Sequence, residues 1–144
     1  MIFFWILRIF VLGDRMEAYM KEIISTDKAP AAIGPYSQAI CVGDMIYTSG
    51  MIPINPTDGT LCTGTIEEQA DRAISNLKAL IEESGSSLDK VVKTTVFIKN
   101  MDDFAKVNEV YARYFTSNYP ARSCVEVARL PKDVLIEIEA IALR

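Results

Sequence analysis

The chain has 144 residues, of which 50% are hydrophobic and 24% are charged, so it fits a single domain with a sizeable core. Its 15 basic and 19 acidic residues give a net charge of −4. The basic residues form no stripe, and we therefore expect no nucleic-acid partner. The absence of histidine excludes Ser-His-Asp and Cys-His catalysis and argues against a zinc site.

The first fifteen residues differ in composition from the rest of the chain. Residues 1–15 are strongly apolar, but they are fewer than the roughly 20 residues that span a bilayer. They also lack the basic start and the small-residue cleavage site of a signal peptide. Met16 and Met20 both fit as the start of the domain, so we predict an N-terminal extension that adds nothing to the fold, followed by one domain over 16–144. An interfacial anchor is the alternative, although we expect no membrane partner.

The next segment predicts three short strands. Residues 22–26, 37–42 and 45–49 are strand-like, and the last two are joined by Gly43 and Asp44. A two-residue Gly-Asp connection between strands is typical of a hairpin.

The best-marked element is a helix that begins after residue 65. Thr65 and Glu68 have the spacing of a capping box, and Gly85 fits the position after a helix end. The apolar stripe of this helix comprises Ile66, Ala70, Ala73, Ile74, Leu77, Leu80 and Ile81.

A β-branched strand over residues 91–99 follows, with Val92, Thr94, Val96 and Ile98 predicted on one face. Asn100 is the predicted cap of a second helix. Its apolar stripe comprises Met101, Phe104, Val107, Val110, Tyr111 and Tyr114.

Two further strands, 121–129 and 134–143, end the chain, separated by Pro131 and Asp133. In the first strand, the pattern predicts a core side with Val125 and Val127 and a mixed side with Arg122, Cys124 and Glu126. In the second strand, one side is uniformly apolar, with Val134, Ile136, Ile138, Ala140 and Ala142. The other side carries Leu135, Glu137, Glu139, Ile141 and Leu143.

The order of elements predicts an α+β fold with two helices on one face of a mixed sheet. We expect Arg122, Cys124, Glu137 and Glu139 to share the other face. Because that face also carries large aliphatic residues and has no helix to cover it, we expect it to meet another subunit.

Three stretches of the sequence resemble the RidA/YjgF family, whose founding activity is 2-iminobutanoate/2-iminopropanoate deamination. They are PARSCVEVARLPKD with the following IEIEAIA, APAAIGPYSQA near the start, and Thr48-Ser49-Gly50. The resemblance covers residues 20–144. It implies a chorismate-mutase-like six-stranded mixed sheet and a homotrimer with clefts between subunits. It also implies that the last strand lies between the strands at 45–49 and 91–99, which brings Glu137 near Gly50.

The resemblance also implies roles for individual residues. Arg122 matches the arginine that holds a substrate carboxylate, and Glu137 matches the carboxylate that orients or activates water. A solvent-exposed arginine and an interface ion-pair partner are the alternatives for these two residues, and Glu139 is assigned to structure. Further residues match cleft positions of the family: Tyr36, Ser49, Gly50, Asn108 and Cys124.

Some of these residues have simpler interpretations. Tyr36 also fits an aromatic packed behind the Gly-Pro turn, and Asn108 fits a hydrogen-bonding residue on a helix surface. Cys124 has no neighbouring histidine or lysine to stabilise a thiolate, so the sequence favours a cleft-lining role over a nucleophilic one. The three cysteines show no CxxC spacing, which indicates a reduced, cytoplasmic protein in which Cys41 and Cys62 are small buried residues.

The predicted reaction converts a small-molecule imino acid into a keto acid without a cofactor, because the imine carbon is already electrophilic. Two other classes of function stay open. One is a non-catalytic sensor of small acids or a chaperone-like binding protein, which would depend on Arg122 but not on Glu137. The other is an endoribonuclease or translation inhibitor, against which the acidic charge and the lack of histidine count.

Overall fold

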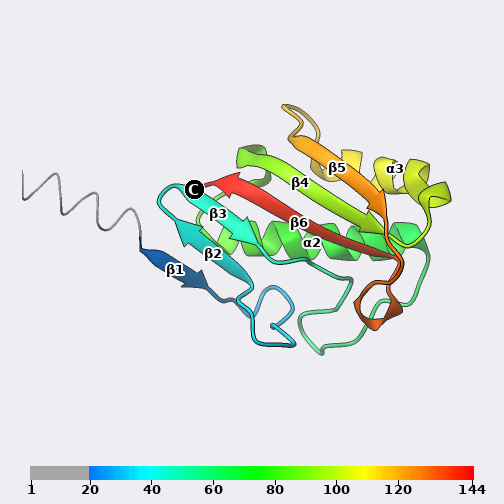
Figure 1. Cartoon of the computed structure of the whole chain (residues 1–144), viewed down its shortest axis with the longest axis horizontal. Helices are drawn as coiled ribbons and strands as arrows, with labels where there is room; N and C mark the ends of the chain where they lie inside the picture. The colour runs from blue at the N-terminus through cyan, green and yellow to red at the C-terminus, as the bar shows by residue number, and fades with distance from the viewer. Residues whose placement is uncertain (1–19) are drawn as a thin grey trace, which may run out of the picture.

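The computed structural model describes residues 20–144, and the predicted extension over residues 1–15 lies outside them. The chain forms one six-stranded sheet in the order β1-β2-β3-β6-β4-β5, with two helices on one side of it (Figure 1). The strands are β1 (Lys21–Ile24), β2 (Ala39–Val42), β3 (Met45–Thr48), β4 (Val91–Ile98), β5 (Ala121–Glu126) and β6 (Ile136–Leu143). The helices are α2 (Ile66–Glu83) and α3 (Phe104–Tyr114), with short 3-10 turns η1 (Leu88–Lys90), η2 (Met101–Asp103) and η3 (Pro131–Asp133).

The sheet is mixed, which confirms the predicted α+β class. β4 and β5 are parallel, and all other neighbours are antiparallel. β6 lies between β3 and β4, as the family resemblance implies, so the last two strands do not form a hairpin. β5 is therefore an edge strand, whereas β6 is central.

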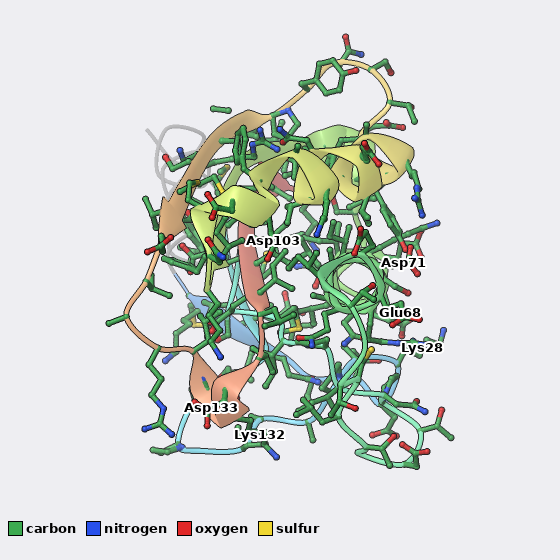
Figure 2. The ribbon with its side chains drawn as sticks, turned by 90° about the vertical axis from the view of Figure 1, so that its right-hand side faces the viewer. Lys28, Glu68, Asp71, Asp103, Lys132 and Asp133 are labelled. Atoms are coloured by element: carbon green, nitrogen blue, oxygen red, sulfur yellow. The ribbon has the colours of Figure 1, made fainter. Side chains whose placement is uncertain are left out.

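Helix α2 forms as predicted. The Thr65 hydroxyl accepts a hydrogen bond from the backbone of Glu68 at 3.3 Å, and the Glu68 carboxylate (labelled in Figure 2) accepts one from the Thr65 backbone at 2.8 Å. Gly85 follows the helix with a φ of 84°, a conformation that glycine adopts without steric cost. The whole predicted stripe is buried in the main core, so α2 is the element that covers the centre of the sheet.

Two predictions of side-chain orientation are wrong. The register between β4 and β6 shifts between Val91 and Lys93, and this bulge leaves Val92 40% exposed instead of on the core face. Asn100 was predicted to cap the second helix, but it caps the 3-10 turn η2, and α3 begins only after Asp103. Because the chain first forms this turn, Met101 and Phe104 are exposed rather than part of the core stripe.

The predicted common face for the functional residues is also wrong. Arg122 and Cys124 of β5 pair with Thr94 and Val96 of the parallel strand β4, and both of these partners are fully buried. Register partners on neighbouring strands point to the same side of the sheet. Arg122 and Cys124 therefore lie on the side that the helices cover.

The two glutamates lie on the opposite side. Glu137 and Glu139 pair with Phe97 and Thr95, which alternate with the buried residues of β4. Val125, predicted to face the core, is 42% exposed on this side. No helix of residues 20–144 covers this face, although a small cluster with Ile52, Ile54 and Leu130 packs against Phe97. The rest of the face exposes Tyr47, Val125 and Leu143.

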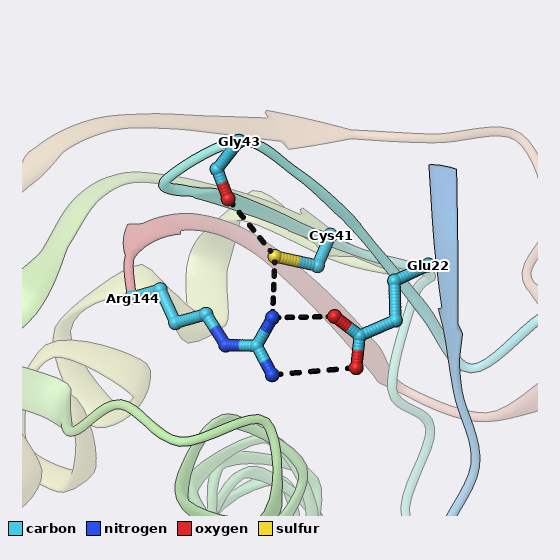
Figure 3. A network of polar contacts seen from close by, with 4 residues as sticks. All are labelled: Glu22, Cys41, Gly43 and Arg144. Carbon is cyan, nitrogen blue, oxygen red and sulfur yellow. Dashed lines mark hydrogen bonds and ion pairs between the residues drawn. The ribbon is translucent and has the colours of Figure 1, made fainter. Parts of the chain in front are cut away.

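The end of the chain is tied to the first two strands by a polar network (Figure 3). Arg144 binds the Glu22 carboxylate with both terminal nitrogens and also contacts the sulfur of Cys41 at 3.4 Å. Cys41 is buried, as predicted, whereas Cys62 is only partly buried. This network adds side-chain contacts between the last residue and the edge strand β1, which is itself paired with β2.

Candidate functional site

Six of the seven predicted site residues, all except Cys124, line two separate pockets. The first, here called the glutamate pocket, has a volume of about 480 Å³. It is lined by Ile33, Tyr36, Thr48, Ser49, Gly50, Ile52, Pro131, Glu137 and Glu139. Four of the predicted site residues, Tyr36, Ser49, Gly50 and Glu137, are therefore brought together here.

Glu137 lies directly against the backbone at Gly50. A Cβ atom at position 50 would overlap the Glu137 carboxyl group, so this position has to be glycine for the carboxyl to lie there. Backbone hydrogen bonds between Met51 and Ile138, at 2.7 and 3.1 Å, hold the two segments together. Burial and, to a smaller extent, the charge of Glu139 raise the pKa of the Glu137 carboxyl. A glutamate with a raised pKa is a stronger base once it is ionised.

Tyr36 and Ser49 hold their positions through backbone contacts. The Tyr36 hydroxyl accepts a hydrogen bond from the backbone N–H of Ile33 at 3.2 Å. The Ser49 hydroxyl donates to the carbonyl of Ser37 at 2.7 Å. Because the Ser49 hydroxyl proton is engaged in this bond, the hydroxyl can only accept a hydrogen bond from a ligand.

Two buried amide side chains, which the sequence analysis did not single out, support the loops around this pocket. Gln38 accepts from the backbone of Thr26 at 2.7 Å and donates to the carbonyl of Pro30 at 2.8 Å. Asn76 on α2 donates to the carbonyl of Ile54 at 2.8 Å. The sequence did contain a signal for Asn76, because it is a polar residue beside the apolar stripe of α2.

The turn η3 forms part of the rim of the glutamate pocket through Pro131. Lys132 and Asp133, labelled in Figure 2, have positive φ values of 56° and 57°, which are uncommon outside glycine. Arg129 donates two hydrogen bonds to the Asp133 carboxylate, at 2.8 and 3.0 Å, and these hold the turn.

The second pocket, here called the arginine pocket, has a volume of about 420 Å³. It lies between α3 and the start of β5 and is lined by Asn108, Tyr111, Ala112, Tyr119, Pro120 and Arg122. The predicted residues Asn108 and Arg122 are thus brought together. The guanidinium carbon of Arg122 lies 4.6 Å from the centre of the Tyr111 ring, although the sequence assigned Tyr111 only to the core.

The Arg122 guanidinium is not neutralised within the described part of the chain. No ion pair among residues 20–144 includes it. An unneutralised arginine in a pocket is suited to bind an anionic group, most strongly a carboxylate held by two parallel hydrogen bonds.

Cys124 lies on the same side of β5 as Arg122 but is not among the residues lining the arginine pocket. It is partly buried and packs against the main core. Burial raises the pKa of the Cys124 thiol, and the charge of Arg122 lowers it to a smaller extent. The thiol is therefore mostly protonated at neutral pH, which does not favour a nucleophilic role.

The described residues, 20–144, contain no group of three or more acidic, histidine or cysteine side chains that could hold a metal ion. Within the same range, no helix is long and apolar enough to cross a membrane.

Comparison with known proteins identifies a family. The family model described as Endoribonuclease L-PSP matches residues 26–144. A RutC family protein of Pyrococcus abyssi is 59% identical over 124 residues, which cover 86% of this chain and 98% of that protein. The 2-iminobutanoate/2-iminopropanoate deaminase of Escherichia coli is 53% identical over 128 residues, covering 87% and 99% of the two chains.

A solved structure shows the same fold. The crystal structure of E. coli TdcF with bound serine is 48% identical, covers 85% of this chain and 98% of its own, and has a TM-score of 0.82. Because the family match and the high identities extend over nearly all the described residues, the chain belongs to the RidA/YjgF family, the family of the Endoribonuclease L-PSP model.

Proposed function

We propose that this protein hydrolyses reactive 2-imino acids, such as 2-iminobutanoate and 2-iminopropanoate, to 2-keto acids and ammonia. The observation that carries the proposal is the 53% identity, over almost the full length, to the E. coli protein named for this deamination. The two pockets contain groups that suit the reaction: an arginine without an ion-pair partner among residues 20–144 and a glutamate with a raised pKa.

Arg122 holds the substrate carboxylate in this proposal. A guanidinium binds a carboxylate through two parallel hydrogen bonds, which also orient the imine carbon next to it. The related TdcF was solved with bound serine, a small molecule that carries such a carboxylate. Asn108 lines the same pocket and can contribute a further polar contact to the ligand.

Glu137 activates the water. The carboxylate takes a proton from the water as its oxygen bonds to the imine carbon, the electron pair of the C=N double bond moves to nitrogen, and Glu137 passes the proton to that nitrogen to give a neutral amino alcohol. The hydroxyl proton of this tetrahedral adduct then moves to nitrogen through the same carboxylate as the C–N bond breaks, which releases ammonia, forms the keto group and leaves Glu137 ionised again. One imine and one water thus give one keto acid and one ammonia, with no change in oxidation state.

The complete site requires two copies of the chain, and we propose the homotrimer of the family resemblance. The glutamate pocket and the arginine pocket share no lining residue. Arg122 lies on the edge strand and on the helix side, whereas Glu137 lies on the central strand and on the opposite side. The uncovered apolar face around Tyr47, Val125 and Leu143 is a suitable surface for the association that would join the two pockets.

The activity is tested by generating 2-aminoacrylate from serine with a dehydratase and timing the release of ammonia and pyruvate. Adding this protein should increase the rate well above that of spontaneous hydrolysis. A folded protein that leaves both rates unchanged would contradict the deaminase proposal and favour a non-catalytic binding function.

The composite site is tested by unfolding and refolding Arg122→Ala and Glu137→Ala together in equal amounts. With random assembly, about a quarter of the clefts should combine an intact arginine wall with an intact glutamate wall and regain activity. Each variant refolded alone is the control. No recovery, despite mixed oligomers seen by mass spectrometry, would mean that the two residues do not act across a subunit boundary.

A further inference from the structure

Among residues 20–144, the Arg122 guanidinium lies against two aromatic rings and forms no ion pair with an acidic side chain. Its guanidinium carbon lies 4.6 Å from the centre of the Tyr111 ring and 5.6 Å from that of Phe104. Both distances are within the range of a cation–π contact. A ring face orients the cation without occupying its hydrogen-bond donors, whereas a carboxylate neighbour would compete with a substrate carboxylate for them.

Tyr111 is itself held firmly. Its side chain is on the buried side of α3, with the residue only 6% exposed, and its hydroxyl lies 2.9 Å from that of Thr94, which is fully buried. The ring also stacks on Phe115, with the two ring centres 4.3 Å apart. Burial, the contact with Thr94 on β4 and the stacking on Phe115 therefore fix the ring.

The strand register links this support directly to the arginine. Thr94 on β4 is the pairing partner of Arg122 on β5. This strand pairing therefore positions both Arg122 and the Thr94 hydroxyl, which contacts the hydroxyl of the Tyr111 ring under the guanidinium. Burial raises the pKa of the Tyr111 hydroxyl, with the Thr94 hydrogen bond and the Arg122 charge acting the other way, so the phenol is neutral at physiological pH.

We propose that Tyr111 is a positioning residue, which holds the Arg122 guanidinium in the plane that receives the substrate carboxylate, and that Thr94 anchors Tyr111. This inference rests on the proposed function, because it takes Arg122 as the carboxylate-binding group. Two parallel hydrogen bonds require a fixed guanidinium plane. Without the ring, the long arginine side chain would lose more conformational freedom when the substrate binds, which weakens binding.

The experiment compares steady-state constants for a 2-imino acid in variants of the full chain. Tyr111→Leu, which removes the ring but keeps an apolar side chain, should raise KM about tenfold or more and change kcat less. Tyr111→Phe, which keeps the ring but loses the hydrogen bond to Thr94, should recover most of the lost affinity but not all of it, and the remaining deficit measures the Thr94 anchor. Val110→Ala is the matched control, because Val110 is a fully buried neighbour on the same helix. It should lower the melting temperature without raising KM.

A second comparison keeps the shape of the ring. Replacing Tyr111 by pentafluorophenylalanine reverses the charge distribution of the ring face, so KM should be about threefold or more above that of Tyr111→Phe. Equal KM values in these two folded proteins would overturn the inference, even if Tyr111→Leu does not fold.

Arg122→Ala, measured in parallel, separates the two proposals. If this variant is fully active, the role of Arg122 in the proposed function is wrong. If it is inactive while Tyr111→Leu matches Val110→Ala in KM, only the positioning role is wrong.

Discussion

The glutamate pocket and the arginine pocket are built in different ways. In the glutamate pocket, a central strand and two loops place the Glu137 carboxyl against the backbone of Gly50, where burial disfavours its charged form. The arginine pocket is formed by an edge strand and a helix. There the Arg122 guanidinium lies against aromatic rings and has no acidic partner among the described residues. Each pocket thus contains a group suited to a different part of a substrate, and neither pocket contains both groups.

The largest expected effect is at the arginine pocket. Arg122→Ala should abolish measurable deamination while the protein stays folded, because the proposed charge-assisted bidentate contact with the substrate carboxylate is lost and Arg122 makes no ion pair within residues 20–144. The expected loss in kcat/KM is about 100-fold or more, since hydrogen bonds to charged groups contribute about 1.5–3 kcal/mol each. Circular dichroism and the initial rate check this, and near-wild-type activity would remove the anchor role.

In the glutamate pocket, Gly50→Ala should have the next largest effect. The new methyl group would occupy the space of the Glu137 carboxyl and push it aside, and such a displacement can lower the rate about 100-fold. Gly34→Ala is the control, because a Cβ there meets only the Tyr36 ring at an ordinary 3.4 Å. Equal kcat values for the two variants would show that the position of the Glu137 carboxyl is not important.

A smaller effect is expected for Glu139→Gln, which distinguishes the two glutamates. In the proposed mechanism Glu137 must be ionised to act as the base, so its raised pKa moves the acid limb of the kcat/KM profile to higher pH. Glu139 is one cause of that raised pKa. Removing its charge should therefore move the acid limb to lower pH and leave the plateau rate nearly unchanged. A lost plateau rate would instead mean that Glu139 takes part in catalysis.

The smallest effect is expected for Cys124→Ala. Its thiol has a raised pKa and lies outside the set of residues lining the arginine pocket, so the variant should keep most of its activity. The measurement is the same coupled assay, with the melting temperature as a check on packing. Complete loss in a folded protein would restore the nucleophile hypothesis.

Much of the fold could be predicted from local patterns. The capping box at Thr65, the apolar stripe of α2 and the uniform core side of β6 depend on neighbouring residues, and all three are confirmed. The errors arose where the regular alternation fails. A bulge turned Val92 outward, and an extra 3-10 turn displaced Met101 and Phe104 from the core.

For the candidate site, the sequence by itself determined the residue types: a chain without histidine, with Arg122 on one of its last two strands and Glu137 and Glu139 on the other. Alternation within a strand also separated the two sides of β6 correctly, whereas the bulge in β4 broke it at Val92. Alternation could not determine which sides of two different strands lie on the same face of the sheet, because that depends on which strands pair and in which register. Only the tertiary structure decided that Arg122 shares a side with Thr94 while Glu137 faces the other way. Pairing between β4, β5 and β6 joins residues far apart in the chain, and no local pattern contains that information.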